Sequence, residues 1–359
     1  MQIAVIGAGA IGCLVGGKLA QQGHAVTLVG RPRFAETVQQ AGLTIVDDAG
    51  RHTVRNVTAV GDTAAAWAGA SSPFDAAILT VKSYDTATAL DELSAALAQT
   101  GHPVPLVVSL QNGVGNEEAI AARFDAARSD AAHTVAGTLT TPVSVPEVGV
   151  IHIDKPRFTM GLSRWSPAVD AGAFADLHDA LAGAGFKVTA FGDARGMKWT
   201  KLLMNMIGNA TSAILDLAPD QIFADKHLAN LEIDAWREAL AVMRARDIPA
   251  LNVGSFPFAT LAPLIRFGPK PMLRTALRRQ VGDARGGKMP SLHIDLHSGK
   301  GKSEVGWLNG AVVRAGEETG VATPVNRVLT EVLTELVRDP SQMAAWRHNG
   351  ARLLTEVRS

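Results

Sequence analysis

The sequence has few residues that could form disulfides, no long apolar run and no excess of charge. Cys13 is the single cysteine among 359 residues, so no disulfide can form within the chain and no oxidising compartment is required. No apolar run approaches the roughly 18 to 20 residues of a membrane-spanning helix. Lysine plus arginine and aspartate plus glutamate each total 34, which argues against nucleic acid and anionic membranes as partners. We therefore expect a cytoplasmic protein without either partner.

The composition and length indicate a globular protein of two domains. Hydrophobic residues make up 47% of the chain and charged residues 19%, and the length allows each domain its own core. Strands alternate with helices up to about Gly192, and helical patterns dominate beyond it. We expect an α/β fold, with a Rossmann-like parallel-sheet domain over residues 1–192 and an all-α domain over residues 193–359.

The first motif is a glycine turn between a strand and a helix. Gln2–Ile6 is apolar, Gly7-Ala-Gly-Ala-Ile-Gly12 follows, and Cys13–Gln22 has a helical pattern. In the dinucleotide-binding fingerprint the first glycine allows the turn, the second admits the pyrophosphate and the third lets the helix pack closely. A fortuitous glycine-rich turn is the alternative. The expected cofactor contacts are Gly7, Gly9, Ala10, Ile11 and Gly12.

The end of the second strand indicates which dinucleotide binds. Ala25–Val29 is followed by Gly30-Arg31-Pro-Arg33, where an NAD-binding fold carries a carboxylate for the ribose diol. Guanidinium groups bind phosphate oxygens in a bidentate fork, so Arg31 predicts NADP(H). The alternative is two solvated loop arginines.

Two further polar residues follow buried strands. Lys82 comes after the strand Asp75–Val81, and Asn112 after the strand Val104–Leu110. Open α/β sheets bind ligands at the carboxyl ends of their strands. We expect both residues near the cofactor, although a solvated lysine and an ordinary Asn-Gly turn are the plainer readings.

The stretch from Met197 to Ala213 predicts the chemistry. As one continuous helix it aligns Lys201, Asn205 and Asn209 in a single polar stripe on an otherwise apolar surface. Buried ammonium and amide groups need partners, and sites use a few convergent polar groups in apolar walls. These groups could also simply satisfy one another.

The remaining segments complete the expected fold. We expect a hairpin of His133–Thr141 and Gly149–Asp154 around Pro146, and a Pro-rich connection over Pro257–Pro271. The other expected elements are the strands Leu43–Val46, Thr53–Val60, Phe158–Leu162 and Lys187–Phe191, and the helices Ala64–Ala68, Thr86–Ala98, Ala171–Ala184, Leu228–Arg246, Met272–Val281, Lys302–Gly320 and Val325–Val337.

The motifs together resemble the ketopantoate reductase family. The resemblance runs from residue 1 to about residue 340. It is carried by Gly7–Gly12, Arg31, Thr80-Val-Lys82, Gln111-Asn112-Gly113, Trp199-Thr-Lys201 with Asn205 and Asn209, Ser303-Glu304-Val305 and Leu308-Asn309-Gly310.

The resemblance implies roles for individual residues. Lys201 matches the general acid and Glu304 the catalytic carboxylate. Asn205 and Asn209 match substrate-binding amides, and Ser291 the serine that binds the substrate carboxylate. Asn112 matches the amide beside the nicotinamide, while Lys82 and Arg31 match cofactor-associated positions.

The resemblance also implies the reaction, which is NADPH-dependent reduction of ketopantoate to D-pantoate on the route to pantothenate and coenzyme A. A protonated lysine can stabilise the developing alkoxide and donate its proton, and a nearby Glu304 would keep that lysine charged. Two alternatives stay open. One is an NADP-dependent oxidoreductase for another 2-oxo acid or an imine, and the other is a non-catalytic NADPH-binding sensor.

His293 and His297 flank Asp295 at helical spacing, which could suggest a metal site. No third ligand of suitable spacing follows in the sequence, so we expect no metal. The expected partner is a small 2-oxo acid, and a homodimer is left open.

Overall fold

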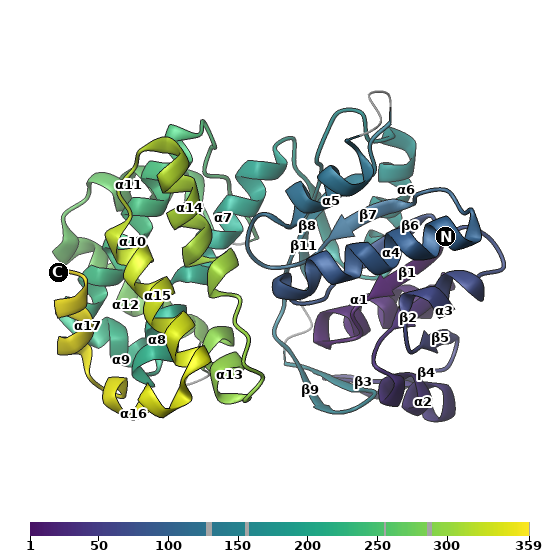
Figure 1. Cartoon of the computed structure of the whole chain (residues 1–359), viewed down its shortest axis with the longest axis horizontal. Coiled ribbons are helices and arrows are strands. Elements are labelled where there is room, and N and C mark those ends of the chain that lie inside the picture. The colour runs from purple at the N-terminus through teal and green to yellow at the C-terminus, as the bar shows by residue number, and fades with distance from the viewer. Residues whose placement is uncertain (127–130, 155–157, 255, 286–288, 359) are drawn as a thin grey trace. The chain divides into compact units, whose positions relative to one another are not determined.

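The computed structural model describes residues 1–126, 131–154, 158–254, 256–285 and 289–358 (Figure 1). Contacts within the chain define two compact units, one formed by Met1–Gln111 with Gly115–Lys198 and the other by Asn112–Val114 with Trp199–Ser359. The division falls inside α7 (Ala194–Met206) rather than at Gly192. Each unit is described by itself below.

The first unit contains a Rossmann-like sheet, as expected from the sequence. Its eight strands lie in the order β12-β11-β8-β7-β6-β1-β2-β5. From β5 to β8 neighbouring strands pair in parallel, β11 runs antiparallel to β8, and β12 is parallel to β11. The strands are β1 (Gln2–Ile6), β2 (Ala25–Val29), β5 (Val57–Val60), β6 (Ala76–Leu79), β7 (Leu106–Ser109), β8 (Thr134–Thr140), β11 (Thr159–Arg164) and β12 (Lys187–Ala190).

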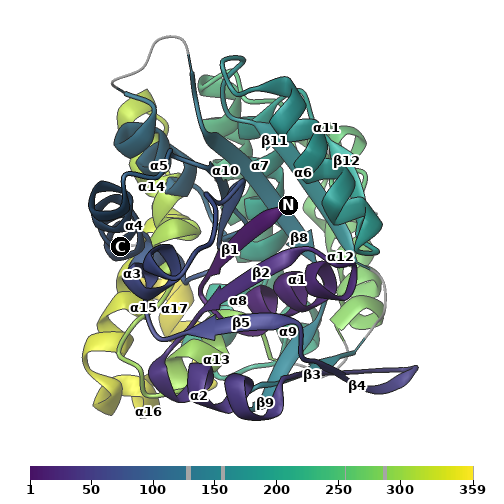
Figure 2. The ribbon, with the colours of Figure 1, turned by 90° about the vertical axis from the view of Figure 1, so that its right-hand side faces the viewer.

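Helices cover both faces of this sheet because its strands are apolar on both sides (Figure 2). Ile3 and Val5 share a core with α1 (Ala10–Gln21), α2 (Pro32–Ala41) and α6 (Ala171–Gly183). Ala4 and Ile6, on the opposite face of β1, share a core with three other helices. These are α3 (Thr63–Ala68), α4 (Thr86–Thr100) and α5 (Asn116–Phe124).

A smaller sheet corrects the expected hairpin. β8 belongs to the large sheet and pairs with β7 and β11, so it forms no hairpin with the strand after Gly149. The hairpin instead joins β9 (Val143–Glu147) and β10 (Val150–Ile153), and β3 (Leu43–Asp47) and β4 (Gly50–Val54) complete this sheet. Pro146 lies inside β9, while Gly149, at φ +77°, makes the turn. The expected hairpin is wrong because β8 pairs with β7 and β11, which are distant from it in the sequence.

The second unit is helical, as expected. Trp236 lies in its core, where its indole N–H donates to the carbonyl of Leu203 at 2.8 Å. No helix among the described residues combines the length and apolar character needed to cross a membrane. Besides α7 the helices are α8 (Asn209–Leu215), α9 (Pro219–Ala224), α10 (Lys226–Ala245), α11 (Phe258–Phe267), α12 (Lys270–Arg285), α13 (Ser291–His297), α14 (Asn309–Thr319), α15 (Pro324–Arg338), α16 (Met343–Trp346) and α17 (Gly350–Glu356), with the short 3₁₀ turns η2 (Val305–Trp307) and η3 (Pro340–Gln342). A further 3₁₀ turn, η1 (Ser83–Asp85), belongs to the first unit.

Three expectations for this unit are wrong. The helix expected over Lys302–Gly320 is instead the 3₁₀ turn η2 followed by α14. The segment taken as a Pro-rich connection contains α11, which accommodates Pro263 within it. The helix expected from Met197 to Ala213 is interrupted, because Gly208 adopts φ +65° between α7 and α8. Buried Glu232 of α10 accepts hydrogen bonds from the Gly208 N–H at 2.8 Å and from the Thr211 hydroxyl at 2.5 Å. The break is therefore held by a carboxylate that local sequence does not reveal.

Candidate functional site

The glycine turn of the first unit has room for a phosphate group. A Cβ on Gly12 would lie 2.1 Å from the Gly7 carbonyl oxygen, and one on Gly7 would lie 2.6 Å from the Val81 nitrogen, whereas one on Gly9 would meet no atom within 4 Å. Gly7 and Gly12 therefore pack the turn against its neighbours, and Gly9 borders open space. The N–H groups of the first helical turn have no partner within the helix, and no side chain caps α1 at Gly9. These features fit a bound pyrophosphate.

Arg31 and Lys82 lie at the carboxyl ends of two strands beside this turn. The Gly7 and Ala8 N–H groups both donate to the Val29 carbonyl at 3.0 Å, which ties the turn to the end of β2. A Cβ on Gly30 would lie 2.9 Å from that of Ala8, so exposed Arg31 follows directly beyond the turn. Lys82 directly precedes η1, after β6, and is half-buried. Both residues therefore lie close to the glycine turn, and their contact with a cofactor stays a prediction.

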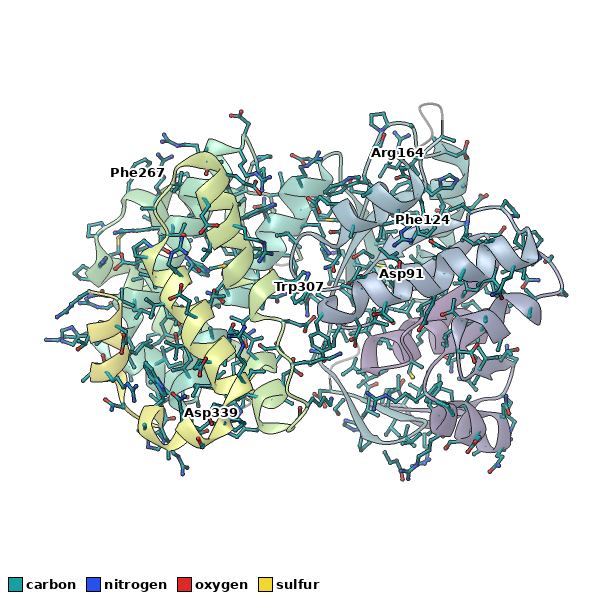
Figure 3. The ribbon with its side chains drawn as sticks, viewed as in Figure 1. Asp91, Phe124, Arg164, Phe267, Trp307 and Asp339 are labelled. Carbon is teal, nitrogen blue, oxygen red and sulfur yellow. The ribbon has the colours of Figure 1, made fainter. Side chains whose placement is uncertain are left out.

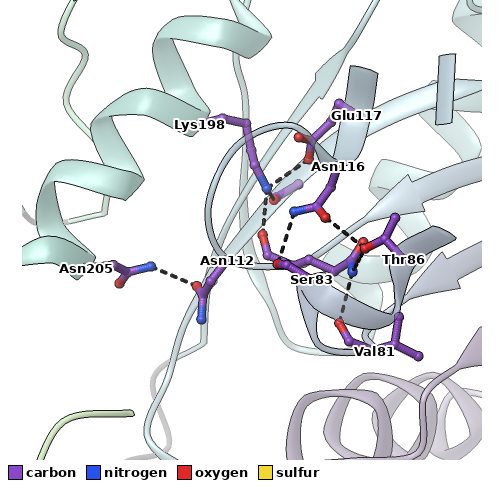
Figure 4. Close-up of polar contacts among 10 residues, drawn as sticks. Val81, Ser83, Thr86, Asn112, Asn116, Glu117, Lys198 and Asn205 are labelled. Carbon is purple, nitrogen blue, oxygen red and sulfur yellow. Dashed lines mark hydrogen bonds and ion pairs between the residues drawn. The ribbon is translucent and has the colours of Figure 1, made fainter. Parts of the chain in front are cut away.

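A buried ion pair in the first unit was missed from the sequence (Figure 4). Lys198 of α7 lies 2.8 Å from Glu117 of α5, and their side chains are only 2% and 1% exposed. The ammonium also donates to the carbonyls of Gln111 at 2.7 Å and Gly137 at 3.2 Å. These contacts fix the start of the loop that carries Asn112. The sequence feature that could have indicated this pair is the charge of Lys198 in an otherwise apolar stretch.

The same loop is fixed by the side chain of Gln111. Its amide donates to the Val81 carbonyl at 3.0 Å and to the Thr86 hydroxyl at 2.7 Å, and Thr86 donates to Asn116 at 2.8 Å. Asn116 in turn donates to Ser83 at 3.3 Å. This network links the segments that follow β6 and β7, so the backbone at Val81 and Gln111 is held in place.

The second unit contains the residues expected to act on a substrate. Lys201 is 7% exposed and lies one turn before Asn205 on α7, so both side chains share a helix face. The Asn205 amide donates to the exposed Asn112 side chain at 2.9 Å (Figure 4). Two of the expected site residues from distant parts of the sequence are thus in direct contact.

Asn209 and Ser291 extend this polar group despite the helix break. The Asn209 amide donates to the Asn205 carbonyl at 2.9 Å and to the Ser291 hydroxyl at 3.3 Å, and its oxygen accepts from the Leu292 N–H at 3.0 Å. Asn209 therefore caps the first turn of α13 and holds Ser291. The alternative stated for these residues, that their polar groups satisfy one another, therefore describes the contacts of Asn209 correctly.

Glu304 is also placed in the second unit, directly before η2. It is 3% exposed. The loop residues Gly113 and Val114 contact the end of η2: the Val114 N–H donates to the Trp307 carbonyl at 3.2 Å, and a Cβ on Gly113 would lie 2.4 Å from that oxygen. Only glycine, here at φ +82°, allows this approach. Trp307 is labelled in Figure 3.

The described residues therefore fall into two sets. The glycine turn, Arg31 and Lys82 lie in the first unit, and the six residues expected to contact the substrate and nicotinamide lie in the second. A parallel sheet with a glycine turn, joined to a helical unit with a buried lysine, defines a class of two-unit dinucleotide-binding proteins.

Comparison with known families identifies the class more closely. The family model described as Ketopantoate reductase PanE/ApbA matches residues 3–165, and the model for its C-terminal part matches residues 193–337. The chain belongs to the ketopantoate reductase family. It is a 2-dehydropantoate 2-reductase-like oxidoreductase that uses a nicotinamide cofactor.

Individual relatives agree with this assignment. The 2-dehydropantoate 2-reductase of Pyrococcus horikoshii is 28% identical over 330 residues, which cover 92% of this chain and 95% of that protein. The crystal structure of a PanE/ApbA family ketopantoate reductase from Ralstonia eutropha JMP134 superposes with a TM-score of 0.77 at 28% identity, covering 95% of this chain and all of that one. D-mandelate dehydrogenase, solved with NADH and anilino(oxo)acetate, has the same fold, with a TM-score of 0.75 at 20% identity over 95% of this chain and 99% of its own.

Proposed function

We propose that this protein reduces ketopantoate to D-pantoate with NADPH in the cytoplasm. The observation that carries the proposal is the polar set of the second unit, in which buried Lys201 and Glu304 accompany Asn112, Asn205, Asn209 and Ser291. An oxidoreductase acting on a 2-oxo acid needs a proton donor for the carbonyl oxygen and polar groups for the carboxylate. This set contains both.

Lys201 is the proposed general acid. Its ammonium donates a hydrogen bond to the C2 carbonyl oxygen, stabilises the negative charge that develops there, and then transfers a proton to give the hydroxyl group. Glu304, buried in the same unit, is proposed to hold the lysine in its charged form before turnover, because a nearby carboxylate favours an ammonium.

The amides and Ser291 are proposed to position the substrate. The two amide hydrogens of Asn209 and one lone pair of its oxygen are already used within the protein. We therefore assign Asn209 to holding Ser291 in place, and Ser291 to the substrate carboxylate. Asn205, which donates to the Asn112 side chain, is assigned to the hydroxyl and carbonyl side of the substrate, and Asn112 is assigned to the nicotinamide.

The first unit is proposed to bind NADPH, which supplies the hydride. Gly9 leaves room for the pyrophosphate at the start of α1, Arg31 binds the 2′-phosphate, and Lys82 binds the cofactor beside it. NADH is the alternative, since D-mandelate dehydrogenase of the same fold was solved with NADH.

Steady-state kinetics with the purified chain test the proposal. Loss of NADPH absorbance would be followed with ketopantoate, with other 2-oxo acids including phenylglyoxylate, and with an imine formed from an oxo acid and an amine. We expect the highest kcat/KM for ketopantoate. A higher value for another acceptor would transfer the function to that substrate class, and tight NADPH binding without any turnover would favour the sensor.

A further inference from the structure

We propose that Asp216, His293 and His297 bind a transition-metal ion, preferably Zn²⁺, at a site separate from the residues assigned to catalysis. One carboxylate oxygen and one ring nitrogen from each histidine lie within 4.8 Å of one another. It is the single such group among the residues that the structure describes. All three residues belong to the second unit.

The donor atoms face one another closely. The His293 Nε2 lies 2.7 Å from the Asp216 Oδ1, and the rings of His293 and His297 stack with centroids 4.0 Å apart. Donor atoms around tetrahedral zinc lie roughly 3.3 Å apart, since zinc–nitrogen and zinc–oxygen bonds are about 2.0 to 2.2 Å long. Shifts on the order of 1 Å within the cluster would satisfy this geometry.

His297 has the orientation that a metal ligand needs. Its Nδ1 lies 2.9 Å from the carbonyl oxygen of His293. A carbonyl only accepts, so this contact places the proton on Nδ1 and leaves the Nε2 lone pair for a metal. Such a hydrogen bond from the second ring nitrogen accompanies most zinc-binding histidines.

Asp216 is fixed by contacts around it. It follows α8 at φ +52°, its Oδ2 lies 2.9 Å from the Arg347 Nε, and its carbonyl lies 3.2 Å from the His348 Nε2. Arg347 thus binds Oδ2 of Asp216, and Oδ1 of the same carboxylate faces the histidines. Two imidazoles and one carboxylate suit Zn²⁺ better than Mg²⁺ or Ca²⁺, which prefer oxygen ligands.

A metal ion at this cluster would connect α8 to α13. α8 packs against α13, and Asn209 at the start of α8 holds Ser291 and Leu292 at the start of α13. A metal ion at Asp216 would join the opposite end of α8 to His293 and His297. It would therefore fix α13 at both ends. Local spacing could not indicate this third ligand, because Asp216 precedes His293 by 77 residues.

Metal titration of the purified apoprotein tests the site directly. We expect one equivalent of Zn²⁺ to bind by calorimetry, and one equivalent of Co²⁺ to give the visible absorption bands of a tetrahedral ion. His297→Ala and Asp216→Asn should each weaken Zn²⁺ binding by about tenfold or more, since even supporting residues contribute ten- to a hundredfold. His297 is exposed, so its replacement leaves the core intact.

His227→Ala is the matched control, because His227 is an exposed histidine on α10 of the same unit. It should bind Zn²⁺ as the unmodified protein does. The melting temperature should rise with Zn²⁺ in the unmodified protein and in this control, but not in His297→Ala. Equal Zn²⁺ binding by the unmodified protein and His297→Ala, or no stoichiometric binding at all, would overturn the proposal. Neither outcome depends on the ability to reduce ketopantoate.

Discussion

At the scale of single residues, two lysines less than one helical turn apart in α7 have different surroundings. Lys198 pairs with Glu117 and two carbonyl oxygens in the first unit. Lys201 shares its helix face with Asn205 in the second unit. Lys198 thus stabilises the loop that starts at Gln111, and Lys201 is the proposed proton donor. Substitutions should separate these two roles.

Replacing Lys201 should affect turnover far more than folding. We expect Lys201→Ala to lower kcat for ketopantoate by about 10² or more, because general acids contribute roughly 10² to 10⁴. NADPH binding should persist, as its proposed site lies in the first unit. Kinetics and fluorescence titration measure the two effects, and unchanged turnover in this variant would exclude Lys201 from the mechanism.

Replacing Lys198 should affect folding. Lys198→Met leaves the Glu117 carboxylate buried without its partner, which typically costs about 3 to 5 kcal/mol in the free energy of unfolding, a large fraction of the roughly 5 to 15 kcal/mol that stabilises a whole domain. The double variant Lys198→Met with Glu117→Leu should recover most of that loss. Chemical denaturation measures both.

The exposed pair Arg123–Asp91 provides the control for this comparison (Asp91 is labelled in Figure 3). Asp91→Asn should change the free energy of unfolding by less than about 1 kcal/mol, because exposed pairs contribute little. If Lys198→Met were no more destabilising than Asp91→Asn, the buried pair would have no structural importance.

Arg31 should determine the choice of cofactor. A guanidinium–phosphate contact is a charge-assisted hydrogen bond, so we expect NADPH to be preferred over NADH by about tenfold to a hundredfold in kcat/KM. Arg31→Ala should raise the KM for NADPH and leave NADH kinetics nearly unchanged. Arg51→Ala, at another exposed arginine of the same unit, should change neither. A variant of Arg31 that loses both cofactors equally would contradict phosphate recognition.

At the scale of elements, different glycines of the glycine turn serve packing and cofactor binding. Gly12→Ala places a Cβ 2.1 Å from a backbone oxygen, so it should destabilise the first unit. Gly9→Ala meets no protein atom within 4 Å and should fold normally, yet its methyl group would occupy the space assigned to the pyrophosphate. We expect thermal melting to reveal the first effect and NADPH titration the second. Normal NADPH affinity in Gly9→Ala would place the cofactor elsewhere.

Local pattern predicted the elements well wherever the local sequence decides them. The strand, glycine turn and helix from Gln2 to Gln21 agree because the apolar run, the turn glycines and the helical pattern all indicate the same local structure. The pattern failed where a distant residue decides. Glu232 stabilises the break at Gly208, and β8 pairs with β11.

The same distinction between local and distant residues applies to the candidate site. Lys201 and Asn205 share a face of α7, as their local spacing indicated, and the family motifs predicted that Glu304 and Asn112 belong to the same site. The partners Ser291 for Asn209 and Glu117 for Lys198 are separated by 82 and 81 residues, so no periodicity could indicate the contacts. Asp216, the proposed metal ligand, precedes His293 by 77 residues, so spacing could not indicate that contact either.

At the scale of the whole molecule, the chain has separate hydrophobic cores in its two units. Trp236 and Phe258 belong to the core of the second unit, and β1 contributes to both cores of the first. Because a ligand stabilises what it binds, NADPH at 100 times its Kd should add about 2.7 kcal/mol to the first unit. Hydrogen exchange should therefore slow in peptides from β1 and β2 and stay unchanged in those from α10. Equal protection of α10 would show that both units open together.

The single cysteine makes this protein convenient for site-specific labelling. Cys13 is 2% exposed in α1, and burial raises the pKa of its thiol to about 12, so the nucleophilic thiolate is almost absent at neutral pH. A cysteine introduced at exposed Ile294 of α13 (52% exposed) would react with a maleimide dye while Cys13 stays untouched. A fluorophore could thus be attached to α13 in the native sequence background, without first removing a natural thiol.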